Sequence, residues 1–168
     1  MASTYTPIAT TTLAVSAASY TFSSIPSTYT DLILIAAVKG TVGSPTDYTE
    51  QLQYNGDTTS GLYSDTILKG DGTTASSNRH SGQNQIYIST LGYLSTTNIR
   101  TTIVQIQNYA NTSTYKTCLV RDNQADAAVG ATVGLWRNTA AISSVTMSLQ
   151  GGTFGIGSTF TLYGILSA

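Results

Sequence analysis

The sequence predicts an all-β fold, an antiparallel sandwich of two sheets with a jelly-roll-like topology. Only 9% of its 168 residues are charged, against about 25% in ordinary globular domains. A surface helix needs a charged wet face, so helices are not expected. Thr and Ser together supply 50 residues, and Thr fits the pleated, half-buried surface of a strand. About eight to ten short segments, separated by turn residues, complete the pattern of a sandwich.

Two segments define the expected core. In Gly157–Ile165, Phe160 and Leu162 alternate with polar residues and Tyr163, so they share one face of a strand. Asp31–Val38 is apolar at successive positions, which indicates a central strand buried on both faces. A strand at the end of the sequence needs a partner formed earlier, and we expect that partner within residues 20–38.

The other segments follow in order. Residues 58–82 are interpreted as a long surface excursion that contains one packed element, such as a turn of helix, formed by Leu62, Tyr63, Ile67 and Leu68. Residues 122–130 read as a loop, and Asn55-Gly56 predicts a turn with positive φ. Further strands are expected at Tyr20–Phe22, Glu50–Tyr54, Gln85–Ser89, Ile99–Tyr109, Tyr115–Arg121, Thr132–Arg137 and Ile142–Leu149.

The first 19 residues form an expected N-terminal arm, outside a single sandwich domain at 20–168. This arm is rich in Thr, Ser and Ala, with Tyr5, Ile8 and Leu13 among its few large apolar side chains. Two alternatives account for its order. It either pairs as an edge strand, or a neighbouring molecule holds it, and we favour the neighbouring molecule for the first ten residues.

Candidate catalytic and metal-binding residues are few. His80, the single histidine, lies in a Gly/Ser/Asn segment and is interpreted as a solvated loop residue. Cys118 alternates within a strand and is interpreted as a small buried apolar group. The acids Asp57, Asp65 and Asp71 lie near turn residues, where Asp commonly stabilises the turn. We therefore expect no catalytic residue, no metal site, no cofactor and no enzyme activity.

Charge and hydropathy also limit the partners. The seven Lys and Arg residues are scattered, whereas a nucleic-acid footprint needs them clustered. The longest apolar run, Leu32–Val38, is far shorter than a membrane span. The beginning of the sequence has no positive charge before Lys39 and no apolar run of signal length. We expect neither nucleic-acid nor membrane binding, and synthesis in a cytoplasm.

Three motifs together resemble small structural proteins of tailed-bacteriophage virions, a diffuse group with jelly-roll-like β folds. They are Phe22-x-x-Ile25-Pro26-x-x-Tyr29-Thr30-Asp31-Leu32, Asn55-Gly56-Asp57, and Gly157-Ser158-x-Phe160-x-Leu162-Tyr163-Gly164-Ile165. Tyr115-Lys116-Thr117 and the segment Gly134–Thr139, followed by Ile142, also resemble the middle of these proteins. The resemblance covers roughly residues 20–165 and implies no catalytic residue.

What the resemblance implies is a virion protein made in the cytoplasm of a bacterial host. The expected role is capsid decoration: the protein, as a homotrimer, binds the major capsid protein on the outer surface of the head shell and stabilises it. The expected contacts with the shell or a neighbour are Tyr5, Ile8 and Leu13 in the N-terminal arm, and Tyr63, Tyr93 and Trp136 as aromatic anchors. The alternative is a tail, neck or fibre module that binds host-surface carbohydrate through surface Tyr, Asn and Gln.

Overall fold

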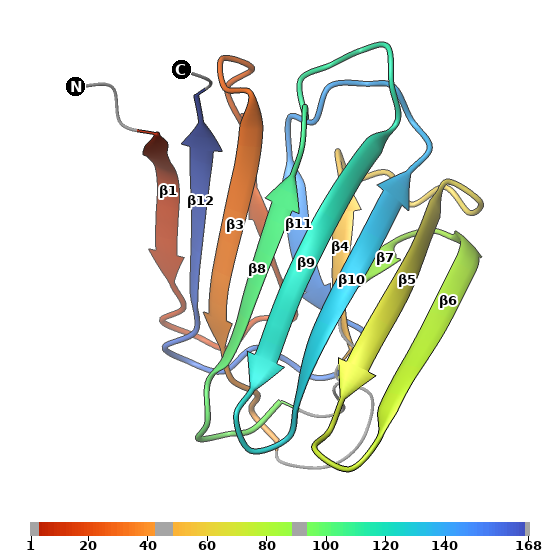
Figure 1. Cartoon of the computed structure of the whole chain (residues 1–168). Helices are drawn as coiled ribbons and strands as arrows, with labels where there is room; N and C mark the ends of the chain where they lie inside the picture. Colours follow the sequence, from red (N-terminus) through yellow and green to blue (C-terminus); the bar gives the residue numbers. More distant parts are fainter. Residues whose placement is uncertain (1–3, 43–48, 89–93, 167–168) are drawn as a thin grey trace.

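The computed structural model describes residues 4–42, 49–88 and 94–166 (Figure 1). In this part of the chain there are twelve strands and no helix. Their bounds are β1 Tyr5–Thr12, β2 Ser19–Phe22, β3 Asp31–Val38, β4 Glu50–Tyr54, β5 Tyr63–Gly70, β6 Ala75–Gln83, β7 Ile86–Tyr87, β8 Arg100–Ile106, β9 Lys116–Gln124, β10 Ala128–Trp136, β11 Val145–Leu149 and β12 Thr159–Ile165.

The strands form two antiparallel sheets that pack as a sandwich. The larger sheet has eight strands in the order β1-β12-β3-β8-β9-β10-β5-β6, and the smaller has four in the order β2-β11-β4-β7. Figure 1 shows the smaller sheet behind the middle of the larger one. The predicted all-β sandwich is therefore confirmed. Its two sheets are unequal, and β8, β9 and β10 form a consecutive meander within one of them.

The core lies between the sheets and follows the period-two alternation of each strand. Leu32, Leu34 and Ala36 on β3 face it, as do Phe160 and Leu162 on β12, all without solvent exposure. The smaller sheet closes the other side with apolar side chains that alternate along β4 and β11. These are Leu52, Tyr54, Val145, Met147 and Leu149.

The last strand has the partner that was expected. β12 pairs along its length with β3, with Leu162 opposite Leu34 and Tyr163 opposite Ile33. Gly164 lies against the ring of Tyr29, and a Cβ at this position would collide with that ring. The last strand is thus enclosed in the larger sheet, between β1 and β3.

The N-terminal arm is not detached from the domain. Tyr5–Thr12 is β1, an edge strand that pairs with the other side of β12 from Tyr5 opposite Ile165 to Thr12 opposite Thr159. Ile8 and Leu13 pack against the hydrophobic core. Of the two alternatives for this segment, the structure has pairing within the chain, as an edge strand of the larger sheet.

Two expected loops are strands. The expected excursion at 58–82 contains the β5–β6 hairpin, in which Lys69 pairs with Ser76 and Asp65 with His80. The expected loop at 122–130 is largely the end of β9 and the start of β10, joined by a tight turn. Both were missed because polar side chains fill inward positions of β5 and β9 and nearly all positions of β6, so hydrophobic alternation is lost. The Asn55-Gly56 turn is confirmed, with φ of 54° and 64°.

Candidate docking face

The side of the eight-stranded sheet that faces away from the smaller sheet carries many apolar residues. We call it the outer face. Register places side chains from distant parts of the sequence in two neighbouring rows across it. The first row is Tyr163, Ile33, Gln105, Leu119, Val133 and Thr66. The second row is Thr161, Ile35, Ile103, Arg121, Ala131 and Leu68.

Several of these apolar side chains are accessible to solvent. Leu68 is 60% exposed, Val133 55% and Leu119 39%. A sheet that is apolar on the solvent side is unusual, since antiparallel sheets commonly present a polar outer face. Continuous exposed apolar surface commonly marks an interaction site.

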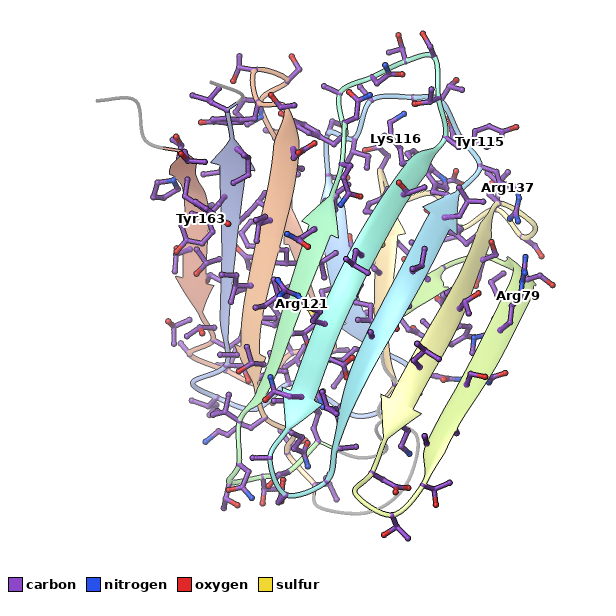
Figure 2. The ribbon with its side chains drawn as sticks, in the orientation of Figure 1. Arg79, Tyr115, Lys116, Arg121, Arg137 and Tyr163 are labelled. Carbon is purple, nitrogen blue, oxygen red and sulfur yellow. The ribbon has the colours of Figure 1, made fainter. Side chains whose placement is uncertain are left out.

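Two arginines lie on the outer face away from its corner at Asp31. Arg121 lies over the middle of the sheet and Arg79 toward β6, as Figure 2 shows. The acids of the same strands, Asp65 and Asp122, point the other way and are buried. Among the described residues of these strands, Asp31, at one end of β3, is the acid whose position alternates in phase with the outer-face residues Ile33 and Ile35. The outer face thus suits a partner that combines apolar surface with carboxylates.

The size of the outer face matches a specific interface. Eight strands about 4.8 Å apart, each contributing roughly six residues at about 3.3 Å, give a footprint of roughly 750 Å². A standard protein interface buries about 800 Å² on each partner. One such sheet can therefore form a complete interface by itself.

Each edge strand of this sheet has a feature that hinders pairing with a further strand. On β1, Pro7 lacks an N–H and the register shifts between Pro7 and Ala9. On β6, the side chain of Asn78 accepts a hydrogen bond from the backbone N–H of Arg79 at 2.8 Å. That N–H is thereby withheld from an incoming strand.

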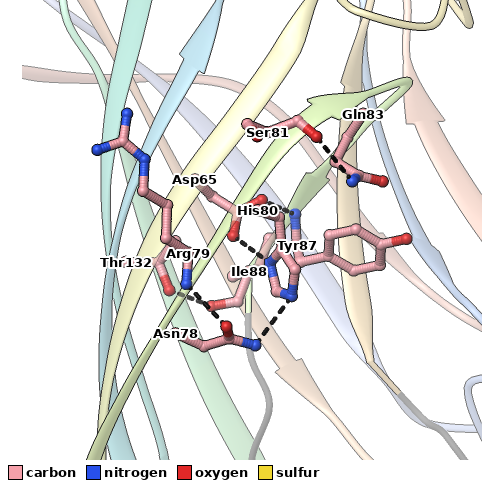
Figure 3. A network of polar contacts seen from close by, with 9 residues as sticks. All are labelled: Asp65, Asn78, Arg79, His80, Ser81, Gln83, Tyr87, Ile88 and Thr132. Carbon is pink, nitrogen blue, oxygen red and sulfur yellow. Dashed lines mark hydrogen bonds and ion pairs between the residues drawn. The ribbon is translucent and has the colours of Figure 1, made fainter.

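Asn78 is held in place by a network around His80 (Figure 3). Asn78 Oδ1 is the acceptor for Arg79, so its Nδ2 donates to His80 Nε2 at 3.0 Å. His80 Nδ1 then carries the proton and donates to Asp65 Oδ1 at 2.6 Å. The other oxygen of Asp65 accepts from the amide of Tyr87 at 3.1 Å, and the rings of His80 and Tyr87 are in contact.

This network joins β6 to β5 and β7, and its geometry is that of a structural hydrogen-bond network rather than a catalytic site. Both nitrogens of His80 are engaged, and its Nε2 meets an amide where a hydrolase would place a nucleophilic hydroxyl. Burial raises the pKa of Asp65, although hydrogen bonds from His80 and from the Tyr87 amide act in the opposite direction. His80 is therefore half-buried and paired, and its interpretation as a solvated loop residue is wrong.

The other residues considered as catalytic or metal-binding candidates, such as Cys118 and Asp71, lie in environments that indicate a structural role. Cys118 is buried, as predicted, and burial raises the pKa of its thiol to about 11, which disfavours the nucleophilic thiolate. Asp71 accepts backbone N–H groups from Thr73 and Thr74 in the β5–β6 turn, as expected for a turn residue. In residues 4–42, 49–88 and 94–166, no three His, Cys, Asp or Glu side chains gather as metal ligands would.

The predicted contact residues are placed as follows. Tyr5 is 52% exposed and packs edge-to-face on Tyr163, beside the outer face. Tyr63 and Trp136 are 0% and 1% exposed, because both point between the sheets and stack on each other. Neither can contact a partner in this fold, and that expectation is corrected. Tyr93 lies outside the described residues.

The outer face was not predicted from the sequence, although the pattern of apolar residues in β9 and β10 indicates it. Leu119 and Val133 lie at the alternate positions of strands whose other positions are Cys118, Val120 and Trp136. Apolar residues on both parities indicate a strand covered on both faces. In a sheet with only one covered face, the same pattern predicts an exposed apolar surface on the other face, which here is the outer face.

No family model matches the chain, and no curated protein matches it. The described part of the chain has no helix of the length and apolarity needed to span a membrane.

Proposed function

We propose that this chain is a non-enzymatic structural protein of a bacteriophage virion, and that it decorates the outer surface of the capsid. The observation that carries the proposal is the outer face, a broad apolar sheet surface whose charges are Arg121 and Arg79. Its occupant is the shell surface formed by the major capsid protein, at a site that presents apolar side chains and carboxylates.

The fold supports a decorating role through its rigidity. The sandwich has a continuous core, and the last strand is enclosed between β1 and β3. A rigid surface loses little conformational entropy on binding. A protein that binds only the assembled shell stabilises that shell by mass action. The proposal includes a jelly-roll-like relationship for the sandwich and a homotrimer on the shell.

Replacement of Val133 by Asp tests the docking surface. The side chain is exposed on the outer face, so Val133→Asp should fold normally while burying a charge in the interface. We expect at least a tenfold loss of co-sedimentation with purified shells assembled without this protein. Val15→Asp is the matched control, because Val15 is 71% exposed in the β1–β2 connection, outside the eight strands that form the outer face. Shell binding by Val133→Asp at the wild-type level would contradict the proposal.

A hollow at one corner of the outer face favours a second candidate, a tail, neck or fibre module that binds host-surface carbohydrate. Its volume is about 160 Å³, and Tyr5, Asp31, Gln105 and Gln107 contribute to its lining. Amides, a carboxylate and an aromatic ring are suited to the hydroxyl groups and apolar faces of a sugar. A glycan array probed with the wild-type protein and with Gln105→Ala separates the two functions: a glycan signal that Gln105→Ala abolishes supports this candidate.

A further inference from the structure

The two sheets are joined at one end by buried polar side chains rather than by apolar ones. Glu50, at the start of β4, comes from the smaller sheet. Arg100 and Thr102 on β8, with Asp122 and Gln124 on β9, come from the larger sheet. All five are at most 1% exposed. We call this group the polar joint.

The polar joint is an ordered part of the fold. Thr102 Oγ1 donates to Glu50 Oε2 at 2.9 Å, and Arg100 Nη1 lies 3.9 Å from the same oxygen. Arg100 Nη2 donates to Gln124 Oε1 at 3.3 Å. A Cβ at position 130 on β10 would lie 2.6 Å from Asp122 Oδ1, so Gly130 makes room for this carboxylate.

Glu50 is the member of the joint whose burial is least compensated by hydrogen bonds and charge. Its second oxygen, Oε1, is fully buried, and none of the described residues forms a hydrogen bond with it. Of the described titratable groups, Arg100 faces it from β8 and Asp122 from β9, so two carboxylates surround one guanidinium. An ionised carboxylate with an unbonded oxygen is costly in such a place, and binding of a proton removes its charge.

We propose that the polar joint is a proton-operated clasp between the sheets, which closes when Glu50 binds a proton and loosens when Glu50 loses it. The clasp operates whichever partner covers the outer face. Loss of the proton leaves a second negative charge in a space that excludes water, and local opening admits water to solvate it.

The direction of the pH effect follows from the environment of Glu50. Burial raises its pKa to about 7, Asp122 contributes in the same direction, and Arg100 and the Thr102 hydroxyl oppose the shift. A pKa above the unfolded value of 4.5 means that the stabilisation is complete below pH 4.5. It is lost progressively as pH rises from 4.5 to the folded value of about 7, and the loss is complete above that value.

Hydrogen exchange of the wild-type protein and of Glu50→Gln tests the clasp, because Gln keeps the shape of the side chain and cannot ionise. Between pH 4.5 and about 7, wild-type protection factors for β4 and the adjoining ends of β8 and β9 should fall by up to about tenfold per pH unit, and above this range they should level off. Those of Glu50→Gln should stay constant. Asp71→Asn, which alters an exposed acid in a turn, is the control and should behave as wild type.

The same pH dependence in wild type and Glu50→Gln, or constant wild-type protection, would overturn the proposal. If Glu50→Gln does not fold, the carboxyl carbon resonance of Glu50 in the wild-type protein decides. A titration midpoint near 7 supports the clasp, and a midpoint at the unfolded value of 4.5 refutes it.

Discussion

Asp57 connects a turn to the single tryptophan of the chain. Its Oδ2 accepts a hydrogen bond from Trp136 Nε1 at 3.0 Å, and its Oδ1 accepts from the Thr59 amide at 3.0 Å. Partial burial acts to raise the pKa of Asp57, but these bonds and one from Asn138 outweigh it and hold the pKa below its usual value. The ionised carboxylate is therefore the form that the fold uses.

Asp57→Ala should lower the free energy of unfolding by about 2 kcal/mol at neutral pH, because it leaves the Trp136 N–H without its charged acceptor. The folded pKa lies below 3.8, so this contribution is present above that pH and lost as pH falls through the folded value. Urea unfolding at pH 7 and at pH 3, followed by Trp136 fluorescence, should show a smaller difference between the two proteins at pH 3. An equal difference at both pH values would contradict this role.

Gly164 is the residue where the last strand approaches Tyr29 most closely. Gly164→Ala would place a methyl group into the Tyr29 ring, and overpacking of this kind costs about 1–3 kcal/mol. A lower thermal midpoint is therefore expected. Gly70→Ala is the control, since its Cβ would meet nothing closer than Val129 at 3.9 Å. Equal stability of the two variants would show that Tyr29 can move away at no cost.

At this scale, the sequence identified apolar core residues better than buried polar ones. Phe160, Leu162 and Cys118 are buried as their alternation predicted. Glu50, Asp65 and Asp122 are buried too, yet polar side chains were assigned to solvent or to turns. Each lies in phase with apolar neighbours, as Asp65 does with Tyr63 and Ile67. The partners that compensate their burial come from distant strands, which no local pattern reveals.

Among the elements, β6 depends most on side-chain contacts with its neighbours. It is an edge strand with nearly every side chain exposed, and its inward contacts are those of the Asp65–His80–Asn78 network. Such a strand would template pairing with other chains unless its N–H groups were occupied. The bond from Arg79 N–H to Asn78 occupies one of them in the middle of the strand.

Asn78→Val should therefore promote self-association through the exposed edge. Light scattering after size-exclusion chromatography should show a larger species whose amount grows with protein concentration. Ser76→Val is the control, because it adds the same side chain two residues away on the same strand parity and leaves the Asn78 cap intact. If both variants remain at the wild-type mass, the cap does not protect this edge.

A strand could be predicted from the sequence where its burial produces a regular alternation of apolar and polar residues. β3, β11 and β12 are half- or fully buried along their length, so their alternation is continuous and they were predicted. β6 has solvent on both sides of most residues and shows no alternation. β1 is recognisable only from its partner, since its pairing with β12 joins the two ends of the sequence.

At the scale of the whole molecule, charge is separated from the surface proposed for docking. Five charged side chains of the described residues are buried: Glu50, Asp65, Arg100, Lys116 and Asp122. Exposed acids such as Asp71 and Asp126 lie in turns at the ends of strands. The outer face is left apolar with two arginines, so docking should depend on shape and apolar contact and only moderately on salt.

The central claim is that this protein decorates the head shell, and its stoichiometry in intact virions tests it most directly. Quantitative mass spectrometry of purified particles gives the number of copies relative to the major capsid protein. Decoration predicts a ratio of the same order as the number of equivalent positions on the shell, and loss of the protein from particles that carry Val133→Asp. A ratio typical of a tail or neck component, or absence from the virion, would contradict it.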